Sequence, residues 1–197
     1  MKIPMISALV LGLASTAVAN PIQWTTEEGG NGHFYEAINV PGSLSWTGAQ
    51  LFAEALGGHL ATLTSAAENT FVFENVVDDL SLWKIDSFGF LIGPYIGLFQ
   101  DTSSPSYSEP DGGWVWLTGE DLLFSSWAAG QPNNVGGQGY GHFWAGRSTV
   151  PLPTWQDIQN SDPVNSPVSF VVEYVPTPGT ALPLIASGVL LGRRRRS

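Results

Sequence analysis

The chain has 197 residues, of which 43% are hydrophobic, and this is enough for one domain with a core of ordinary size. All seventeen acidic residues lie between Glu27 and Glu173, a stretch whose basic residues are Lys84 and Arg147. Because so acidic a body repels phosphate backbones and anionic lipid, we expect no nucleic-acid binding. The charge suits calcium or a neutral sugar as ligand, and it serves solubility alone equally well. The lack of cysteine excludes disulfides, thiol catalysis and Cys-ligated zinc.

Residues 1–19 have the pattern of a secretory signal peptide. Lys2 supplies the positive start, Ile3 to Leu13 is a mostly apolar run, and Ala17 to Ala19 has the small-x-small form of a cleavage site. The apolar run is too short for a transmembrane helix, which needs about 20 residues. We therefore expect an exported protein whose mature domain begins at Asn20.

Two amphipathic helices are expected next. The first begins at Ser45 and should end at Gly57 and Gly58, because glycine readily adopts the left-handed stop conformation. Its predicted apolar face consists of Trp46, Ala49, Phe52, Ala53 and Leu56. Ser65 and Glu68 have the spacing of a capping box, in which each side chain bonds the other residue's backbone N–H. The second helix is expected to continue through Phe71, Val72, Asn75, Val76 and Leu80.

The rest of the domain reads as short strands and loops. Strands are predicted at Tyr95 to Leu98, Trp114 to Trp116 and Val168 to Tyr174, where aromatic or β-branched residues stand between turn residues. The stretch from about Ser125 to Pro167 is predicted to be a long irregular loop, a feature that is usually functional or disordered. Helices first and strands later favour an α+β fold over a parallel βαβ sheet.

An ordered set of short motifs resembles the C-type lectin domains over roughly Phe34 to Tyr174. The set consists of Trp46 with Ala49, Gly57 to Leu63, Glu68 with Phe71, Tyr95 to Leu98, Trp114 with Trp116, Gly119, Trp127, Gln131 to Asn133, Trp155 to Asp157 and Val171 to Tyr174. The resemblance implies the C-type lectin-like fold, with two helices followed by short antiparallel strands and a long irregular loop. That family carries two disulfides, whereas this chain has other residues at those positions, near Ala53, Tyr140, Asp162 and Val172.

The resemblance also implies a ligand site. In that family, calcium lies in the long loop and two sugar hydroxyls complete its shell. Carried over, the ligands are Gln131, Asn133, Gln156 and Asp157, with a cis peptide before Pro132 and Asp101 as an auxiliary ligand. Calcium takes six to eight oxygens, usually with several carboxylates, whereas three of the four loop ligands are neutral amides. The alternative is that the amides of the tripeptide simply hydrogen-bond the loop, as turn amides often do.

Two aromatic residues beside the glycine-rich loop are further candidates for sugar binding. Tyr140 and Trp144 could stack on a pyranose face, although such aromatics more often belong to a core. The tryptophans assigned to the core alone are Trp46, Trp116, Trp127 and Trp155.

The C-terminal segment, residues 176–197, resembles the PEP-CTERM sorting signals of Gram-negative bacteria. A proline motif that starts at Pro176 is followed by a short apolar run from Ala181 to Gly192 and by Arg193 to Arg196. The arginines would stay on the cytoplasmic side of a membrane. Thr177 departs from the resemblance, because glutamate is usual there. A plain membrane anchor is the alternative.

The leading interpretation is a carbohydrate-binding recognition domain, residues 20–175, located at the cell surface, at the outer membrane or in secreted form. Its partner would be a carbohydrate or exopolysaccharide, and its tail would contact the membrane before processing. We expect no catalysis, because the three histidines are widely spaced and metalloprotease, nucleophile-elbow and phosphate-loop motifs are missing. The alternative is a C-type lectin-like surface protein without sugar binding, acting in adhesion to protein or extracellular matrix.

Overall fold

The computed structural model describes residues 20–162 and 164–176, and the predicted signal peptide and most of the sorting segment lie outside them. The helices are α1 (Trp46–Ala55) and α2 (Ala66–Val72), and a π-helical turn (Phe73–Val77) continues α2. Two 3-10 turns are formed by Thr26–Glu28 and Leu80–Leu82. The strands are β1 (Ile22–Gln23), β2 (Phe34–Asn39), β3 (His59–Leu60), β4 (Lys84–Ile85), β5 (Leu91–Gln100), β6 (Trp114–Trp116), β7 (Tyr140–Trp144), β8 (Trp155–Ile158) and β9 (Ser169–Tyr174).

One mixed sheet organises these elements. Its strand order is β1-β2-β9-β5-β7-β8, with β3 paired to β9 and with β4 and β6 paired to β5. The pairings are antiparallel except the contact between β5 and β9, where Tyr95 lies opposite Phe170 in parallel. The α+β prediction is therefore confirmed, although β1 and β2 precede the helices instead of following them.

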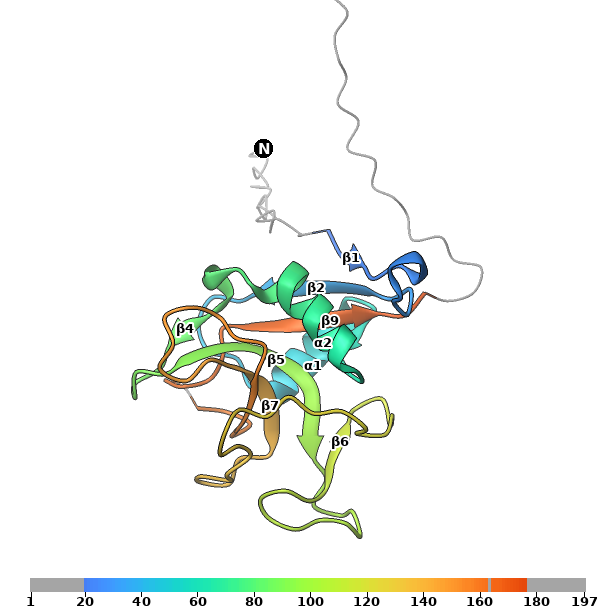
Figure 1. Cartoon of the computed structure of the whole chain (residues 1–197). Helices are drawn as coiled ribbons and strands as arrows, with labels where there is room; N and C mark the ends of the chain where they lie inside the picture. The colour runs from blue at the N-terminus through green and yellow to red at the C-terminus, as the bar shows by residue number, and fades with distance from the viewer. Residues whose placement is uncertain (1–19, 163, 177–197) are drawn as a thin grey trace, which may run out of the picture.

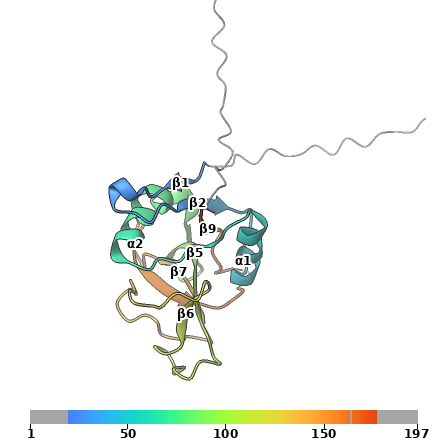
Figure 2. The same cartoon turned by 90° about the vertical axis from the view of Figure 1, so that its right-hand side faces the viewer.

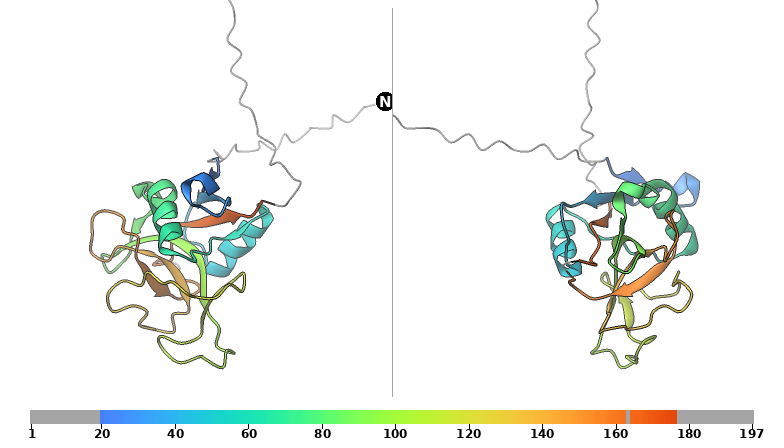
Figure 3. Two further views of the ribbon diagram at one scale, coloured as in Figure 1. Left: turned by 45° about the vertical axis from the view of Figure 1, so that its right-hand side comes forward. Right: turned by 90° about the vertical axis from the view of Figure 1, so that its left-hand side faces the viewer.

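The two helices cover opposite sides of β2 and β9, as Figure 2 shows, while the longer loops gather around β6 at the other end of the domain (Figure 1). Both views in Figure 3 place these loops opposite β1. The two ends of the described chain lie on the β1 side, because β1 pairs with β2 and Phe34 of β2 lies opposite Tyr174 of β9. The ends of the described chain therefore lie away from the loop end of the domain.

Helix α1 begins and ends as predicted. The Ser45 hydroxyl accepts the Gly48 N–H at 3.0 Å, and Gly57 follows the helix with a φ of 88°. The predicted apolar face is partly wrong, because Phe52 and Leu56 are 53% and 47% exposed. The face that packs on the sheet is narrower and consists of Trp46, Ala49 and Ala53.

Helix α2 begins at its predicted cap but lacks the reciprocal half of the capping box. The Ser65 hydroxyl accepts the Glu68 N–H at 3.1 Å, whereas the Glu68 carboxylate accepts the N–H and hydroxyl of Thr64 at 2.7 and 2.8 Å. The α-helix ends at Val72, and Leu80 lies in a separate 3-10 turn. The second helix is thus shorter than the apolar pattern predicted.

The region predicted as one long loop contains two strands. Strands β7 and β8 pair along their length, from Tyr140 opposite Ile158 to Phe143 opposite Trp155. Their residues include glycine, histidine, glutamine and aspartate, which hid them from a search for apolar alternation. The three predicted strands are confirmed as β5, β6 and β9, and β5 is longer than predicted.

The core of the described domain consists of two clusters of buried apolar residues, and the chain has no disulfide to connect its elements. Three of the four tryptophans assigned to the core, Trp46, Trp116 and Trp155, are at most 3% exposed. Trp127 is partly buried and packs edge-on against Trp155 at a ring separation of 6.0 Å. Ala53 and Val172, which stand where the resembled family carries cysteine, are fully buried in the same cluster. Apolar packing therefore joins α1 to β9.

Within the residues that the structure describes, no helix is long and apolar enough to cross a membrane.

Candidate functional site

The predicted ligand loop runs from Gly130 to Gly137 and turns sharply at several points. The Gln131–Pro132 peptide bond is cis, as the resemblance implied. Gly130, Gly136 and Gly137 have φ values between 75° and 82°, a conformation that residues with a side chain rarely adopt. The loop therefore leaves the Trp127 bridge to β8 and returns to β7 within a short span.

Asp157, on β8, holds this loop in place. Its side chain is fully buried, and its carboxylate accepts the Asn133 N–H at 3.0 and 3.1 Å and the Asn134 N–H at 2.6 Å. Burial raises the pKa of Asp157, and the two N–H groups act in the opposite direction by stabilising the ionised form. The Asp157 carboxylate therefore points into the loop and positions the loop backbone at Asn133 and Asn134.

Beside the loop lies a groove with a cavity volume of about 510 Å³. Strands β7 and β8, the ligand loop, the turn between β4 and β5 and the segment before β9 all contribute to it. The lining is rich in amides and aromatic rings and consists of Asp86, Phe88, Phe90, Ile92, Gln131, Asn133, Val135, Gly136, Gln138, Trp144, Gln156, Ile158, Gln159, Asp162 and Asn165. No lysine or arginine is among these residues.

The groove brings three of the predicted site residues together. Gln131, Asn133 and Gln156 line it, whereas Asp157, Tyr140 and Asp101 do not. Tyr140 packs against Trp46 in the core, with ring centroids 4.9 Å apart. The Asp101 carboxylate accepts the N–H and hydroxyl of Ser103 at 2.9 and 2.6 Å, in the loop after β5.

Trp144 is the aromatic residue that lies at the groove. It is partly exposed on β7, and its ring centroid is 5.6 Å from that of Phe90. The phenylalanines of the β4–β5 turn were missed in the sequence, where nothing places them near the ligand loop. A motif search could not find them, because the register of β5 against β7 brings them there.

Several polar atoms around the groove make no hydrogen bond. In the part of the chain that the structure describes, the Gln131 and Asn134 side-chain oxygens and the Trp144 indole nitrogen are buried without a hydrogen-bond partner. An unpaired buried polar group costs about 1–3 kcal/mol, and in a native protein this requires an explanation. Because these atoms are also closed to solvent, they are not themselves open to a ligand in the groove.

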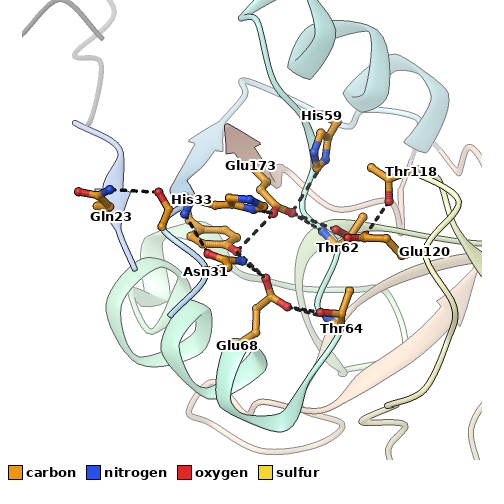
Figure 4. Close-up of polar contacts among 12 residues, drawn as sticks. Gln23, Asn31, His33, His59, Thr62, Thr64, Glu68, Thr118, Glu120 and Glu173 are labelled. Carbon is orange, nitrogen blue, oxygen red and sulfur yellow. Dashed lines mark hydrogen bonds and ion pairs between the residues drawn. The ribbon is translucent and has the colours of Figure 1, made fainter. Parts of the chain in front are cut away.

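A second polar cluster is formed by residues outside the groove lining (Figure 4). The Tyr35 hydroxyl donates to Glu68 at 2.5 Å, and Glu173 accepts the Thr62 N–H at 2.9 Å and lies 2.6 Å from the His33 ring nitrogen. Burial raises the pKa of Glu68. These bonds join α2, β2 and β9, so the cluster is a structural tie between elements far apart in sequence.

Several curated relatives of the chain are named as lectins, among them ladderlectin of Oncorhynchus mykiss, which is 28% identical over 126 residues, covering 64% of this chain and 54% of the relative. The chain is 26% identical over 106 residues to a perlucin-like protein of Mytilus galloprovincialis, covering 53% of this chain and 58% of the relative. It is also 26% identical over 168 residues to asialoglycoprotein receptor 1 of Rattus norvegicus, covering 84% and 48%. The chain spans about half the length of the curated relatives it matches. No protein-family model matches it.

Solved structures decide the fold. The C-type carbohydrate-recognition domain of cow CD23 matches with a TM-score of 0.51 at 19% identity, over 74% of this chain and 89% of that one. Herring type II antifreeze protein matches with a TM-score of 0.53 at 20% identity, over 75% and 94%. The fold is C-type lectin-like. The expected fold class is confirmed, and its neighbours range from a carbohydrate-recognition domain to an antifreeze protein.

The residues of this C-type lectin-like domain do not fit a calcium ion of the usual kind. Calcium takes six to eight oxygens, generally with several carboxylates. Asp157 is the one acid of the loop set, and its oxygens already accept three N–H contacts. Among residues 20–162 and 164–176, no group of three histidine, cysteine, aspartate or glutamate side chains could hold a metal. The calcium site implied by the resemblance stays a prediction.

Proposed function

We propose that this domain binds a neutral carbohydrate in the groove between the ligand loop and strands β7 and β8. The observation that carries the proposal is the lining, which combines the amides of Gln131, Asn133 and Gln156 with the partly exposed ring of Trp144. Relatives named as lectins and the C-type lectin-like fold support the same class of ligand.

The chemistry of this lining suits sugar hydroxyls. An amide side chain offers both hydrogen-bond donors and an acceptor, and a sugar hydroxyl can pair with either. An indole ring offers an apolar face for the C–H side of a pyranose and one N–H donor. The amides of Gln131, Asn133 and Gln156 line the groove, so their donors and acceptors are placed to pair with the hydroxyls of a bound sugar.

The charge of the domain selects among carbohydrates. Asp86 and Asp162 line the groove, and the domain around it is strongly acidic. Uronic acids, sulfated sugars and other anionic glycans are disfavoured by this field. Binding of a neutral glycan in this way needs no metal. The Asp157 carboxylate bonds the loop backbone, and the groups that would contact the sugar are amides and aromatic rings.

A glycan array probed with the full-length chain tests the proposal. Neutral glycans should be retained equally in calcium and in chelator, and Gln156→Ala should weaken retention. Gln50→Ala is the matched control, because Gln50 is a partly buried glutamine on α1 that does not line the groove. Retention that disappears with chelator would restore the calcium mechanism, and an array without any neutral signal would refute sugar binding.

The second candidate is adhesion to a protein or to extracellular matrix. It is favoured by the exposed apolar side of α1, where Leu51, Phe52 and Leu56 are 66%, 53% and 47% exposed. In either case we propose that the domain acts after export, in line with the signal-like pattern of residues 1–19, and the tail after Pro176 would hold it at a membrane before processing. A fractionation experiment that finds the chain in the cytoplasm would contradict this location.

A further inference from the structure

The turn between β4 and β5, residues 86–90, is ordered by its own hydrogen bonds (left in Figure 1). The Asp86 carboxylate accepts the Phe88 N–H at 2.9 Å and the Phe90 N–H at 2.8 Å. The Asp86 N–H donates to the Phe90 carbonyl at 2.9 Å, and Gly89 adopts a φ of 81° that closes the turn. The backbone on both sides of Phe88 is therefore fixed by Asp86.

The same turn is also held by the segment before β9. The N–H and hydroxyl of Ser87 donate to the Asn165 side-chain oxygen at 3.0 and 2.7 Å. Asn165 is in turn held by Asp162, whose carboxylate accepts its N–H and its amide at 3.0 and 2.8 Å. Two walls of the groove are thus joined by side-chain hydrogen bonds, and the turn cannot move independently of the segment before β9.

This rigid turn presents an aromatic side chain to solvent. Phe88 is 65% exposed, although it lines the groove. Phe90 is less available, because its ring contacts Trp144 and lies 4.9 Å below the Arg147 guanidinium. An exposed ring on a preorganised turn loses little conformational entropy when a ligand covers it. Phe88 therefore has the exposure and the rigidity that a binding contact requires.

The size of the groove bears on the length of the ligand. Cavities of about 300–1,000 Å³ hold drug-sized molecules, which are larger than one sugar ring, and this cavity has about 510 Å³. Gln131 and Gln156 come from the ligand loop and β8, whereas Phe88 comes from the β4–β5 turn, and all three line the groove. A cavity of this volume has room for more than the one sugar ring that contacts the amides.

We infer that Phe88 forms a second subsite, which stacks on a further ring of a neutral oligosaccharide whose first ring lies at Gln131, Gln156 and Trp144. The inference rests on the proposed function and narrows it: the ligand is a neutral glycan chain of two or more sugar residues. Asp86 and Asp162 line the groove on the Phe88 side, so a chain with carboxylate or sulfate groups is disfavoured there.

Titration calorimetry of the full-length chain with neutral gluco-, manno- and galacto-oligosaccharides of increasing length tests this subsite. In one of these series, affinity should rise roughly tenfold from the monosaccharide to the longer members, as expected for one aromatic contact. Phe88→Ala should abolish that rise, and Phe88→Tyr should retain it. Phe52→Ala is the matched control, because Phe52 is a similarly exposed phenylalanine on α1 outside the groove.

The outcomes separate the subsite from the proposed function. If Phe88→Ala keeps the full length dependence, or if the unmodified chain binds monosaccharide and longer chains equally, the subsite is wrong and sugar binding stands. If the unmodified chain binds none of the sugars at any length, sugar binding itself fails, and the subsite fails with it.

Discussion

The buried carboxylate of Asp157 accepts the backbone N–H groups of both Asn133 and Asn134, 24 and 23 residues earlier in the chain. These hydrogen bonds attach the loop that contains Gln131 to strand β8. The residue that the resemblance assigned to calcium therefore serves as a support for the loop.

Asp157→Asn should destabilise the domain by about 1–3 kcal/mol, the cost of leaving a buried N–H unpaired. The asparagine amide has one acceptor oxygen where the carboxylate has two, and its NH₂ group would face an N–H donor. Urea unfolding measures the loss, and glycan binding should weaken with it because the loop is displaced. Asp101→Asn, in the loop after β5, is the control, and an equal effect from both variants would contradict the supporting role.

Calcium and chelator should give the same melting temperature for the domain. A bound ion would raise the free energy of unfolding by about 1.4 kcal/mol at tenfold excess over its dissociation constant. We expect no such rise at millimolar calcium, because the predicted loop ligands include one carboxylate, Asp157, and this carboxylate already accepts hydrogen bonds from the loop N–H groups. A calcium-dependent shift that Asp157→Asn abolishes would show that the carboxylate does bind the ion.

Trp155→Ala should destabilise the domain by roughly 3–5 kcal/mol, as large core truncations do. Trp155 is fully buried, its indole N–H donates to Asn69 at 2.9 Å, and its ring packs edge-on against Trp116 at 5.7 Å. Gln131→Ala should change stability little, because its side-chain oxygen makes no hydrogen bond in the described chain. Chemical unfolding compares the two, and similar losses would mean that Gln131 supports the fold.

The domain should lose stability in acid through His142. This histidine is fully buried between β5 and β8, and burial lowers its pKa to about 4 from 6.5. Between pH 6.5 and pH 4 the His142 imidazole binds a proton in the unfolded chain but not in the folded one. The free energy of unfolding therefore falls by about 1.4 kcal/mol per pH unit, roughly 3 kcal/mol by pH 4. In urea unfolding at a series of pH values, His142→Phe should remove this component, and an unchanged acid profile would exclude it.

His33 should act in the opposite direction. Its hydrogen bond with Glu173 raises its pKa, so its contribution is complete below pH 6.5 and is lost as the pH rises through the folded pKa. His33→Asn should therefore destabilise the domain at pH 6 and have little effect at strongly alkaline pH. The same unfolding series measures it, and a loss that is equal at both ends would show that the ion pair is not its cause.

Local chemistry was enough for the sequence to predict much of the framework. Ser45 and Ser65 were found as caps, and Gly57 as a stop, because each of these features depends on residues within one turn of the chain. The buried positions of Trp46 and Trp155 could be predicted as well, since large apolar side chains have few other places in a small domain. The cis peptide at Pro132 came from resemblance to a family and not from local physics.

Contacts between distant segments could be decided only by the tertiary structure. The Glu68 carboxylate bonds Thr64 and Tyr35 instead of its expected capping partner, the Ser65 N–H, and Tyr35 is within reach because β2 lies beside α2. Strands β7 and β8 form in spite of their polar residues, because each supplies backbone hydrogen bonds to the other. Phe88 lines the same groove as the ligand loop because β5 pairs with β7. A sequence specifies its neighbours along the chain directly, whereas the partners of a buried carboxylate or the walls of a groove depend on how all the strands pack together.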